Sequence, residues 1–146
     1  MSKNGRPVDR HRANNDVNAP VRKAEPRKPA RPLCRFDELE DGHSRGFDPL
    51  GEGRDTMFVV RRGERLYAYR NLCPHYDRAR MAWRKNEFLN ADRTRIMCGA
   101  HGALFEIESG DCKIGPCRGQ RLTPVPLEIR DGEVWIEGYY SPGFWR

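Results

Sequence analysis

The sequence predicts an all-β fold built from short antiparallel strands. Its 14 Gly and 11 Pro residues interrupt the chain too often for a long amphipathic helix. Several short segments between these interruptions are rich in β-branched and aromatic residues, which is typical of strands. One pair of such segments flanks Asp131-Gly132, a strong signal for a tight hairpin turn.

The first 31 residues differ in composition from the rest of the chain. They contain nine Lys or Arg against three acids, whereas residues 32–146 carry 18 of each sign. With so few apolar side chains, this segment cannot bury enough surface to offset the entropy lost on ordering. We therefore expect a disordered basic tail over 1–31 and one folded domain over 32–146. Because the tail lacks aromatic residues for base stacking, nucleic-acid binding is its less favoured role.

The folded domain begins with Phe36–Leu39, expected to form one turn of helix or a loop, and with a glycine-rich connector over 42–53. Residues 56–61 and 65–69 then form a hairpin around the turn 62–64, because both segments favour strands. This hairpin leads directly into a loop that contains a cysteine.

Further strands are expected in the second half of the chain. They comprise 88–89 and 94–97 around the polar turn 90–93, 104–107 with a return strand at 111–113, and 123–129 with 133–137 around 130–132. Gly115-Pro116 marks a sharp loop after the return strand. The C-terminal residues 138–146 hold four aromatic side chains, which we expect to cover the domain's own core.

The composition favours a reducing compartment and no membrane anchor. No segment has the length and apolarity of a membrane span, and the N-terminus has no apolar stretch that resembles a signal-peptide core. Five cysteines, two of them beside histidines at ligand spacing, suit metal binding better than a disulfide framework. We therefore expect a cytoplasmic location.

The residues most informative about function form two short motifs, Cys73-Pro74-His75 and Cys98-Gly99-Ala100-His101. Two thiolates and two imidazoles offered from separate loops suit zinc or an iron–sulfur cluster. Structural zinc modules usually pair like with like, whereas each motif here contributes one residue of each kind. The mixed motifs favour an iron–sulfur cluster and leave structural zinc as the alternative.

The C-x-H and C-x2-H motifs together resemble the signature of the Rieske iron–sulfur family, and the resemblance covers residues 34–137. It implies an antiparallel β sandwich with a small cluster-binding subdomain formed by two loops, and a [2Fe-2S] cluster as cofactor. In the family's pattern, Cys73 and Cys98 are the thiolate ligands of one iron. His75 and His101 are then the imidazole ligands of the other iron.

The resemblance also has implications for redox chemistry. A cluster with two ferric ions, two sulfides, two thiolates and two neutral imidazoles is uncharged, and it becomes singly negative on accepting one electron. High-potential members place a Ser after the second His-Gly and a Tyr two residues later, whereas this chain has Ala103 and Phe105. It has Arg78 and Ala100 where those members form a disulfide between the loops. We therefore expect a midpoint potential near the low end of the Rieske range, roughly −150 mV.

Further expectations follow from the same resemblance. The segment 76–97 between the motifs is longer than usual in the family, which predicts an inserted hairpin. The family's proline loop corresponds to Gly115-Pro116-Cys117, so this cysteine should lie near the metal without binding it. A bridge from it to Cys112 stays open, although a reducing compartment favours free thiols. The histidine ligands should keep their outer ring nitrogens near solvent, which couples reduction to proton uptake at high pH.

The resemblance implies a ferredoxin-like protein that carries one electron at a time between a reductase and an acceptor, such as the terminal oxygenase of a dioxygenase system. The chain has no room for a catalytic domain and no second set of His and carboxylate ligands for a mononuclear iron. It would therefore act as an electron-transfer component of an oxidoreductase. The alternatives are a structural zinc-binding module and a cluster-based redox sensor whose basic tail contacts nucleic acid.

Overall fold

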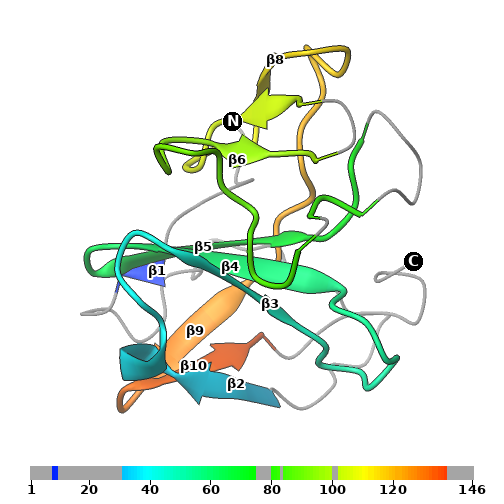
Figure 1. Ribbon diagram of the computed structural model, residues 1–146. Coiled ribbons are helices and arrows are strands. Elements are labelled where there is room, and N and C mark those ends of the chain that lie inside the picture. Colours follow the sequence, from blue (N-terminus) through cyan, green and yellow to red (C-terminus); the bar gives the residue numbers. More distant parts are fainter. Residues whose placement is uncertain (1–7, 10–30, 75–79, 83, 100–101, 138–146) are drawn as a thin grey trace, which may run out of the picture.

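The computed structural model describes residues 8–9, 31–74, 80–82, 84–99 and 102–137. The strands within them are β1 (Val8–Asp9), β2 (Arg31–Arg35), β3 (Ser44–Phe47), β4 (Met57–Arg62), β5 (Arg65–Arg70), β6 (Ile96–Met97), β7 (Leu104–Phe105), β8 (Cys112–Ile114), β9 (Leu127–Arg130) and β10 (Glu133–Ile136). They form three antiparallel sheets in the orders β1-β5-β4-β3, β2-β10-β9 and β6-β7-β8 (Figure 1). The predicted all-β class is confirmed.

Helical structure is limited to a short turn in the part of the chain that is described. The 3-10 helix η1 (Phe36–Glu38) follows β2 directly, at the position where one helical turn or a loop is expected. Its first residue is fully buried and anchors the turn in the core. Among the described residues, no helix has the length and hydropathy that crossing a membrane requires.

The hairpin β4–β5 forms the centre of the largest sheet. Its register pairs Met57 with Arg70 and Arg62 with Arg65. Gly63 takes a positive φ of 65° in the turn, a conformation that glycine adopts without steric cost. The structure therefore confirms the predicted hairpin, with strand boundaries within one residue of those expected.

The largest sheet is buried on both faces. Met57 and Val59 of β4 pack in a core with side chains of β9 and β10. Phe58 and Val60 point the opposite way and pack with side chains of β6, β7 and β8. Because side chains alternate between the two faces of a strand, β4 contributes to two cores at once. In Figure 1 this sheet accordingly lies between the other two.

The segment between the two Cys-His motifs forms the predicted hairpin in its second half. The backbone N–H of Met97 donates to the carbonyl of Phe88 over 2.9 Å, and Leu89 forms a bridge with Ile96. Phe88 stacks on Phe58 of β4, with ring centroids 4.2 Å apart. The central sheet therefore supports the hairpin that ends at the second motif.

Strand β3 corrects one expectation, because it lies within 42–53, which was expected to be only a glycine-rich connector. Gly46 of β3 pairs with Phe58 of β4. A Cβ atom at Gly46 would overlap the side chain of Asp55. The glycine that suggested a loop is therefore needed inside the strand, where a side chain approaches the backbone closely.

The C-terminal hairpin β9–β10 has the predicted turn. Asp131 and Gly132 have φ values of 49° and 79°, the positive values that a tight two-residue hairpin turn requires. The predicted aromatic cover over 138–146 lies outside the described residues, as does most of the predicted tail. Within that tail, Val8–Asp9 departs from the expectation, because these two residues pair with β5.

Candidate metal centre

The first Cys-His motif starts three residues after β5 ends, and Asn71 fastens both ends of its loop. Cys73 is 2% exposed. The side-chain oxygen of the buried Asn71 accepts a 2.8 Å hydrogen bond from the backbone N–H of Met81. The amide nitrogen of Asn71 donates to the carbonyl of Asp55 over 2.9 Å. One amide side chain therefore joins the start of this loop, its end and the preceding connector.

The second motif begins directly after β6, at the fully buried Cys98. Two backbone hydrogen bonds close its loop: the N–H of Cys98 donates to the carbonyl of Ala103 over 2.9 Å, and the N–H of Gly102 donates to the carbonyl of Cys98 over 2.8 Å. Gly102 has a φ of 70°, which favours glycine at this position. The loop is therefore short and closed at its base.

The two loops are joined to each other. The backbone N–H of Gly99 donates to the carbonyl of Met81 over 2.7 Å, so the start of the second loop is bonded to the end of the first. Cys73 and Cys98 belong to the same buried cluster of side chains. His75 and His101, the other two predicted ligands, lie outside the described residues. The structure thus brings together the two predicted thiol ligands at adjoining loop bases.

A third loop, residues 115–120 after β8, packs against the second loop at Ala103. Gly115 has a φ of 112°, and a Cβ atom there would come within 2.9 Å of the Cα atom of Ala103. The proline loop predicted from the family resemblance therefore rests on the backbone of the second loop. Burial raises the pKa of the Cys117 thiol, with further contributions from the neighbouring Cys112 and from Cys73.

The positions that carry hydroxyl groups in high-potential Rieske proteins are apolar here. Ala103 is 1% exposed and Phe105 is fully buried. Neither side chain has a donor to offer to a buried sulfur atom. Both residues belong to the cluster that contains Cys73 and Cys98. The surroundings of the two thiols are therefore mainly apolar.

Tyr69 joins the central sheet to the sheet that carries the second motif. Its hydroxyl group donates a 2.6 Å hydrogen bond to the carbonyl of Ile107. A Cβ atom at Gly110 would lie 2.7 Å from the tyrosine ring, so the turn after Ile107 closes directly over this side chain. Burial raises the pKa of Tyr69 above its ordinary value, with smaller contributions from Glu108, Tyr67 and Asp111.

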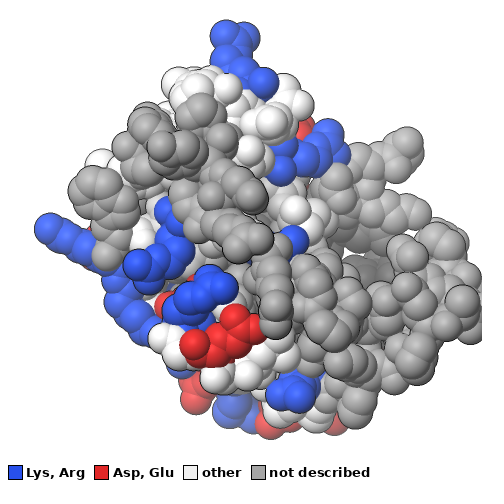
Figure 2. Space-filling model, turned by 90° about the vertical axis from the view of Figure 1, so that its right-hand side faces the viewer, with Lys and Arg blue, Asp and Glu red and all other residues white. Residues whose placement is uncertain are grey.

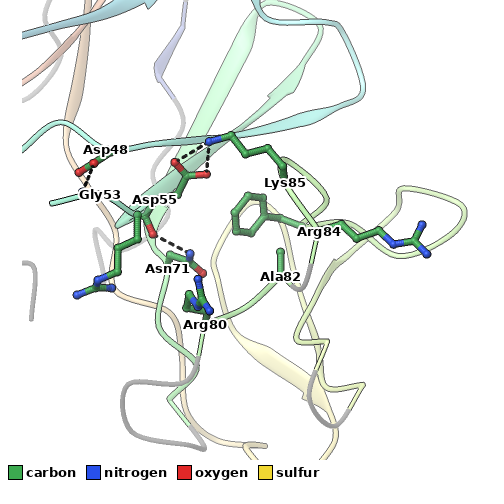
Figure 3. A pocket seen from close by; sticks show the side chains of 10 residues that line it. Asp48, Gly53, Asp55, Asn71, Arg80, Ala82, Arg84 and Lys85 are labelled. Carbon is green, nitrogen blue, oxygen red and sulfur yellow. Dashed lines mark hydrogen bonds and ion pairs between the residues drawn. The ribbon is translucent and has the colours of Figure 1, made fainter. Parts of the chain in front are cut away.

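A pocket of about 510 Å³ lies beside the base of the first loop (Figure 3). Its charged lining comprises four basic residues and two acidic ones: Arg54, Arg80, Arg84, Lys85, Asp48 and Asp55. Lys85 reaches Asp55 at 3.2 Å, whereas the Arg84 side chain extends outward (Figure 3). On the face shown in Figure 2, the blue Lys and Arg side chains cover more of the described surface than the red Asp and Glu side chains.

The donor set fits a metal cluster with sulfur ligands. Two thiols are buried at the bases of adjoining loops, and burial keeps water from competing for the metal. The hydrogen bonds of Asn71 were not anticipated from the sequence, because nothing in the sequence indicates that its side chain bonds to both Asp55 and Met81. The only signal was the position of this asparagine between a strand and the first motif.

Comparison with known proteins agrees with this geometry. The chain is 30% identical over 104 residues to the ferredoxin component of the alkene monooxygenase system of Xanthobacter autotrophicus, which covers 71% of this chain and 77% of that protein. Its structure is similar to the ferredoxin of carbazole 1,9a-dioxygenase from Nocardioides aromaticivorans IC177, with a TM-score of 0.59, 23% identity, and coverage of 77% of this chain and 100% of the other. A ferredoxin of Sphingomonas yanoikuyae B1 gives a TM-score of 0.57 at 25% identity, covering 76% and 100% of the two chains.

The family assignment rests on most of the folded part of the chain. The sequence pattern of the Rieske [2Fe-2S] domain matches residues 30–129, a range that contains both Cys-His motifs and the proline loop. The three antiparallel sheets agree with the solved Rieske ferredoxins. On the evidence of sequence, fold and paired loops, the chain belongs to the Rieske [2Fe-2S] domain family.

Proposed function

We propose that this protein is the ferredoxin component of an oxygenase system and that Cys73, His75, Cys98 and His101 hold its [2Fe-2S] cluster. When bound, the cluster supplies reversible transfer of one electron. The single observation that carries the proposal is the pair of buried thiols at the bases of two loops that are hydrogen-bonded to each other. The similar protein of Xanthobacter autotrophicus is the ferredoxin component of an alkene monooxygenase system, which supports the assignment.

The chain's own residues have three tasks in this function. Cys73 and Cys98 would bind one iron through thiolates that are shielded from water, and His75 and His101 would bind the other through neutral ring nitrogens. Asn71 would hold the first loop closed around the ligands through its hydrogen bonds. Precise positioning of ligands by surrounding hydrogen bonds is what limits rearrangement when the charge of a metal site changes.

The proposal also assigns roles to the parts of the chain and to its partners. We propose that residues 32–146 form the electron-transfer domain, that 1–31 act as a basic tail, and that the protein works in the cytoplasm without catalytic activity of its own. Its partners would be a reductase that delivers the electron and a terminal oxygenase that receives it. A complex between an oxygenase and a ferredoxin is described for carbazole 1,9a-dioxygenase, which supports direct contact with the acceptor.

The decisive experiment is anaerobic purification followed by iron and sulfide analysis and electron paramagnetic resonance of the dithionite-reduced protein. We expect two irons and two acid-labile sulfides per chain, a brown oxidised form and a rhombic spectrum after reduction by one electron. A colourless protein that contains zinc and no sulfide would replace this proposal with the structural zinc module. Single Ala variants at each of the four ligands should lose the spectrum, whereas Cys34→Ala should keep it.

Basic residues outnumber acidic ones in the lining of the pocket, so an acidic surface on the acceptor would fit it. We expect Arg84→Glu to slow oxidation of the reduced protein by a purified oxygenase component several-fold at low ionic strength, because encounter is steered by opposite charges. The difference should vanish at about 0.5 M salt, where exposed charges are screened. Arg130→Glu is the matched control, since this exposed arginine lies on β9. Equal rates for both variants and the unmodified protein would exclude the pocket rim as a docking contact.

A further inference from the structure

Two cysteines that the proposed function does not use lie next to each other. The Sγ atoms of Cys112 and Cys117 are 2.6 Å apart. Cys112 is 5% exposed and Cys117 is fully buried. The sulfur atoms are closer than unbonded sulfur atoms normally approach, and a short movement brings them to the S–S bond length of about 2.05 Å. The two side chains are therefore in position to form a covalent bond.

The backbone around this pair is already closed into a small loop. The N–H of Cys112 donates to the carbonyl of Gln120 over 2.9 Å, and the N–H of Gln120 donates to the carbonyl of Cys117 over 2.9 Å. Between the two cysteines, Gly115 packs on the backbone of Ala103 in the second motif's loop. A bond between the two sulfur atoms would consequently fasten the proline loop where it rests on the metal centre.

We propose that Cys112 and Cys117 are an oxidation site of this protein, a reversible dithiol–disulfide couple that locks the proline loop against the second ligand loop. This inference goes beyond electron transfer, because it assigns a two-electron thiol reaction to residues that bind no iron. Cys34 is excluded as a member of the couple, since it lies on β2 and packs against the other core.

The reaction balances with a hydroperoxide as the oxidant. The more exposed sulfur, that of Cys112, attacks the outer oxygen of the hydroperoxide, the O–O bond breaks, and a sulfenic acid and an alcohol or water are formed. The sulfur of Cys117 then displaces the hydroxyl group as water and forms the S–S bond. Each sulfur loses one electron and one proton overall, and the hydroperoxide takes up the two electrons and two protons as its O–O bond breaks. Thiol exchange with a small dithiol returns the pair to its reduced form.

The test is disulfide mapping on the cluster-loaded protein, with and without one equivalent of hydrogen peroxide. After acid quenching and alkylation, trypsin cuts after Lys113 and Glu-C cuts after Glu108, so that the two cysteines fall into separate peptides free of Cys98. We expect a linked pair of peptides 109–113 and 114–118, the loss of two alkylatable thiols per chain, and their recovery with dithiothreitol. Full alkylation of both cysteines after peroxide, or irreversible oxidation without a link, would overturn the proposal.

Variants and hydrogen exchange test the locking of the loop. Cys117→Ser should abolish the linked peptide and leave Cys112 singly oxidised, whereas Cys34→Ser should give the linked peptide unchanged. In the oxidised protein, the amides of Cys112 and Gln120 should exchange roughly ten-fold or more slowly than in the reduced protein, because the bridge restricts opening of the loop. Equal exchange rates in the two forms would refute the lock. The mapping does not use the cluster's electron, so it fails or succeeds independently of the proposed function.

Discussion

At the scale of single residues, Asn71 shows how one side chain can organise a metal site without touching the metal. Asn71 is 3% exposed, and its side chain forms hydrogen bonds with the backbone of Met81 and Asp55. An asparagine offers both an acceptor and a donor, so it satisfies the buried N–H of Met81 and the partly buried carbonyl of Asp55. Replacing it with an apolar residue leaves both groups without their partner, which costs more than the hydrogen bonds themselves contribute.

We expect Asn71→Ala to lower the free energy of unfolding by about 1–3 kcal/mol, because a buried N–H and a partly buried carbonyl lose their partner. The first ligand loop should also open more often, so the visible absorption of the cluster should decay faster in the presence of an iron chelator. Asn90→Ala is the control, because Asn90 accepts comparable backbone hydrogen bonds in an exposed turn. An equal decay rate for both variants would show that Asn71 has no special role at the site.

A single added hydroxyl group at position 105 tests how the apolar surroundings of the thiols affect the midpoint potential. We expect Phe105→Tyr to raise the midpoint potential by tens of millivolts or more, because a hydroxyl donor near the ligand sulfurs favours the reduced form. The unmodified protein should lie near roughly −150 mV, the low end of the Rieske range. Protein-film voltammetry measures both values. Phe105→Leu controls for changed packing, and a midpoint above about +100 mV in the unmodified protein would contradict the expectation.

Tyr69 predicts how stability depends on pH. Its pKa is raised in the folded protein, above the ordinary value of about 10 that applies to the unfolded chain. The contribution of Tyr69 to the free energy of unfolding is therefore complete below pH 10. It is lost as pH rises beyond that value, because the unfolded chain then releases a proton that the folded protein retains. Urea unfolding between pH 8 and pH 11 should show this decline. Tyr69→Phe should reduce the decline, and should cost about 1–3 kcal/mol at pH 8 because the carbonyl of Ile107 loses its donor.

At the scale of secondary-structure elements, the sequence predicted those hairpins whose turns and strands agree. The hairpins β4–β5 and β9–β10 have strand-forming residues on both sides of a glycine-containing turn, and both are observed. Strand β3 was missed because Gly46 normally weakens a strand. The close approach of Asp55 that requires this glycine depends on the folded arrangement. Local sequence patterns identify most strands, whereas a strand such as β3 that contains a disfavoured residue depends on contacts with segments distant in the sequence.

The candidate site likewise has a part that was predictable from the sequence and a part that was not. The motifs that contain Cys73 and Cys98 were recognisable from spacing alone, and the structure buries both thiols in one cluster. The roles of Asn71 and Tyr69 were not predictable, because each acts through a partner that is distant in the sequence. Ligand types follow from chemistry that is local to a motif. The residues that hold the ligands in place follow only from the folded arrangement.

The inserted hairpin gives a prediction at this scale. Asn86 has a φ of 65°, and its side-chain oxygen accepts a 2.8 Å hydrogen bond from the N–H of Gly46 in β3. Asn86→Ala should destabilise the protein by about 1–3 kcal/mol, because it removes this acceptor and puts alanine into the left-handed region. Asn86→Asp should stay close to the unmodified protein, since it keeps both the acceptor and the tolerance for positive φ. Thermal unfolding of the two variants distinguishes these outcomes.

At the scale of the whole molecule, the charge is distributed unevenly. The formal net charge is +6, and the excess of basic residues lies in the first 31 positions. Electron-transfer partners meet the protein through its long-range field as well as through contacts. We therefore expect the basic residues among positions 1–31 to affect association rates more than the fold.

Deleting residues 1–30 should leave the visible and paramagnetic spectra of the cluster unchanged, because β1, the described part of this segment, pairs with β5 and not with the ligand loops. The shortened protein should bind cation-exchange resin and DNA more weakly, with a shallower dependence on salt concentration. Isothermal titration at two ionic strengths measures this difference. Loss of the cluster spectrum on deletion would show instead that the tail belongs to the folded domain.

The double burial of β4 has a consequence for how the chain finds its structure. A slip of this strand by one residue would exchange the side chains of both cores at the same time, and neither half could compensate for the other. Packing on both faces of β4 therefore fixes the register of this hairpin, and an error in register would expose apolar surface in both cores. We expect the β4–β5 hairpin to couple the folding of the two cores, so that the iron-binding end and the opposite end form cooperatively.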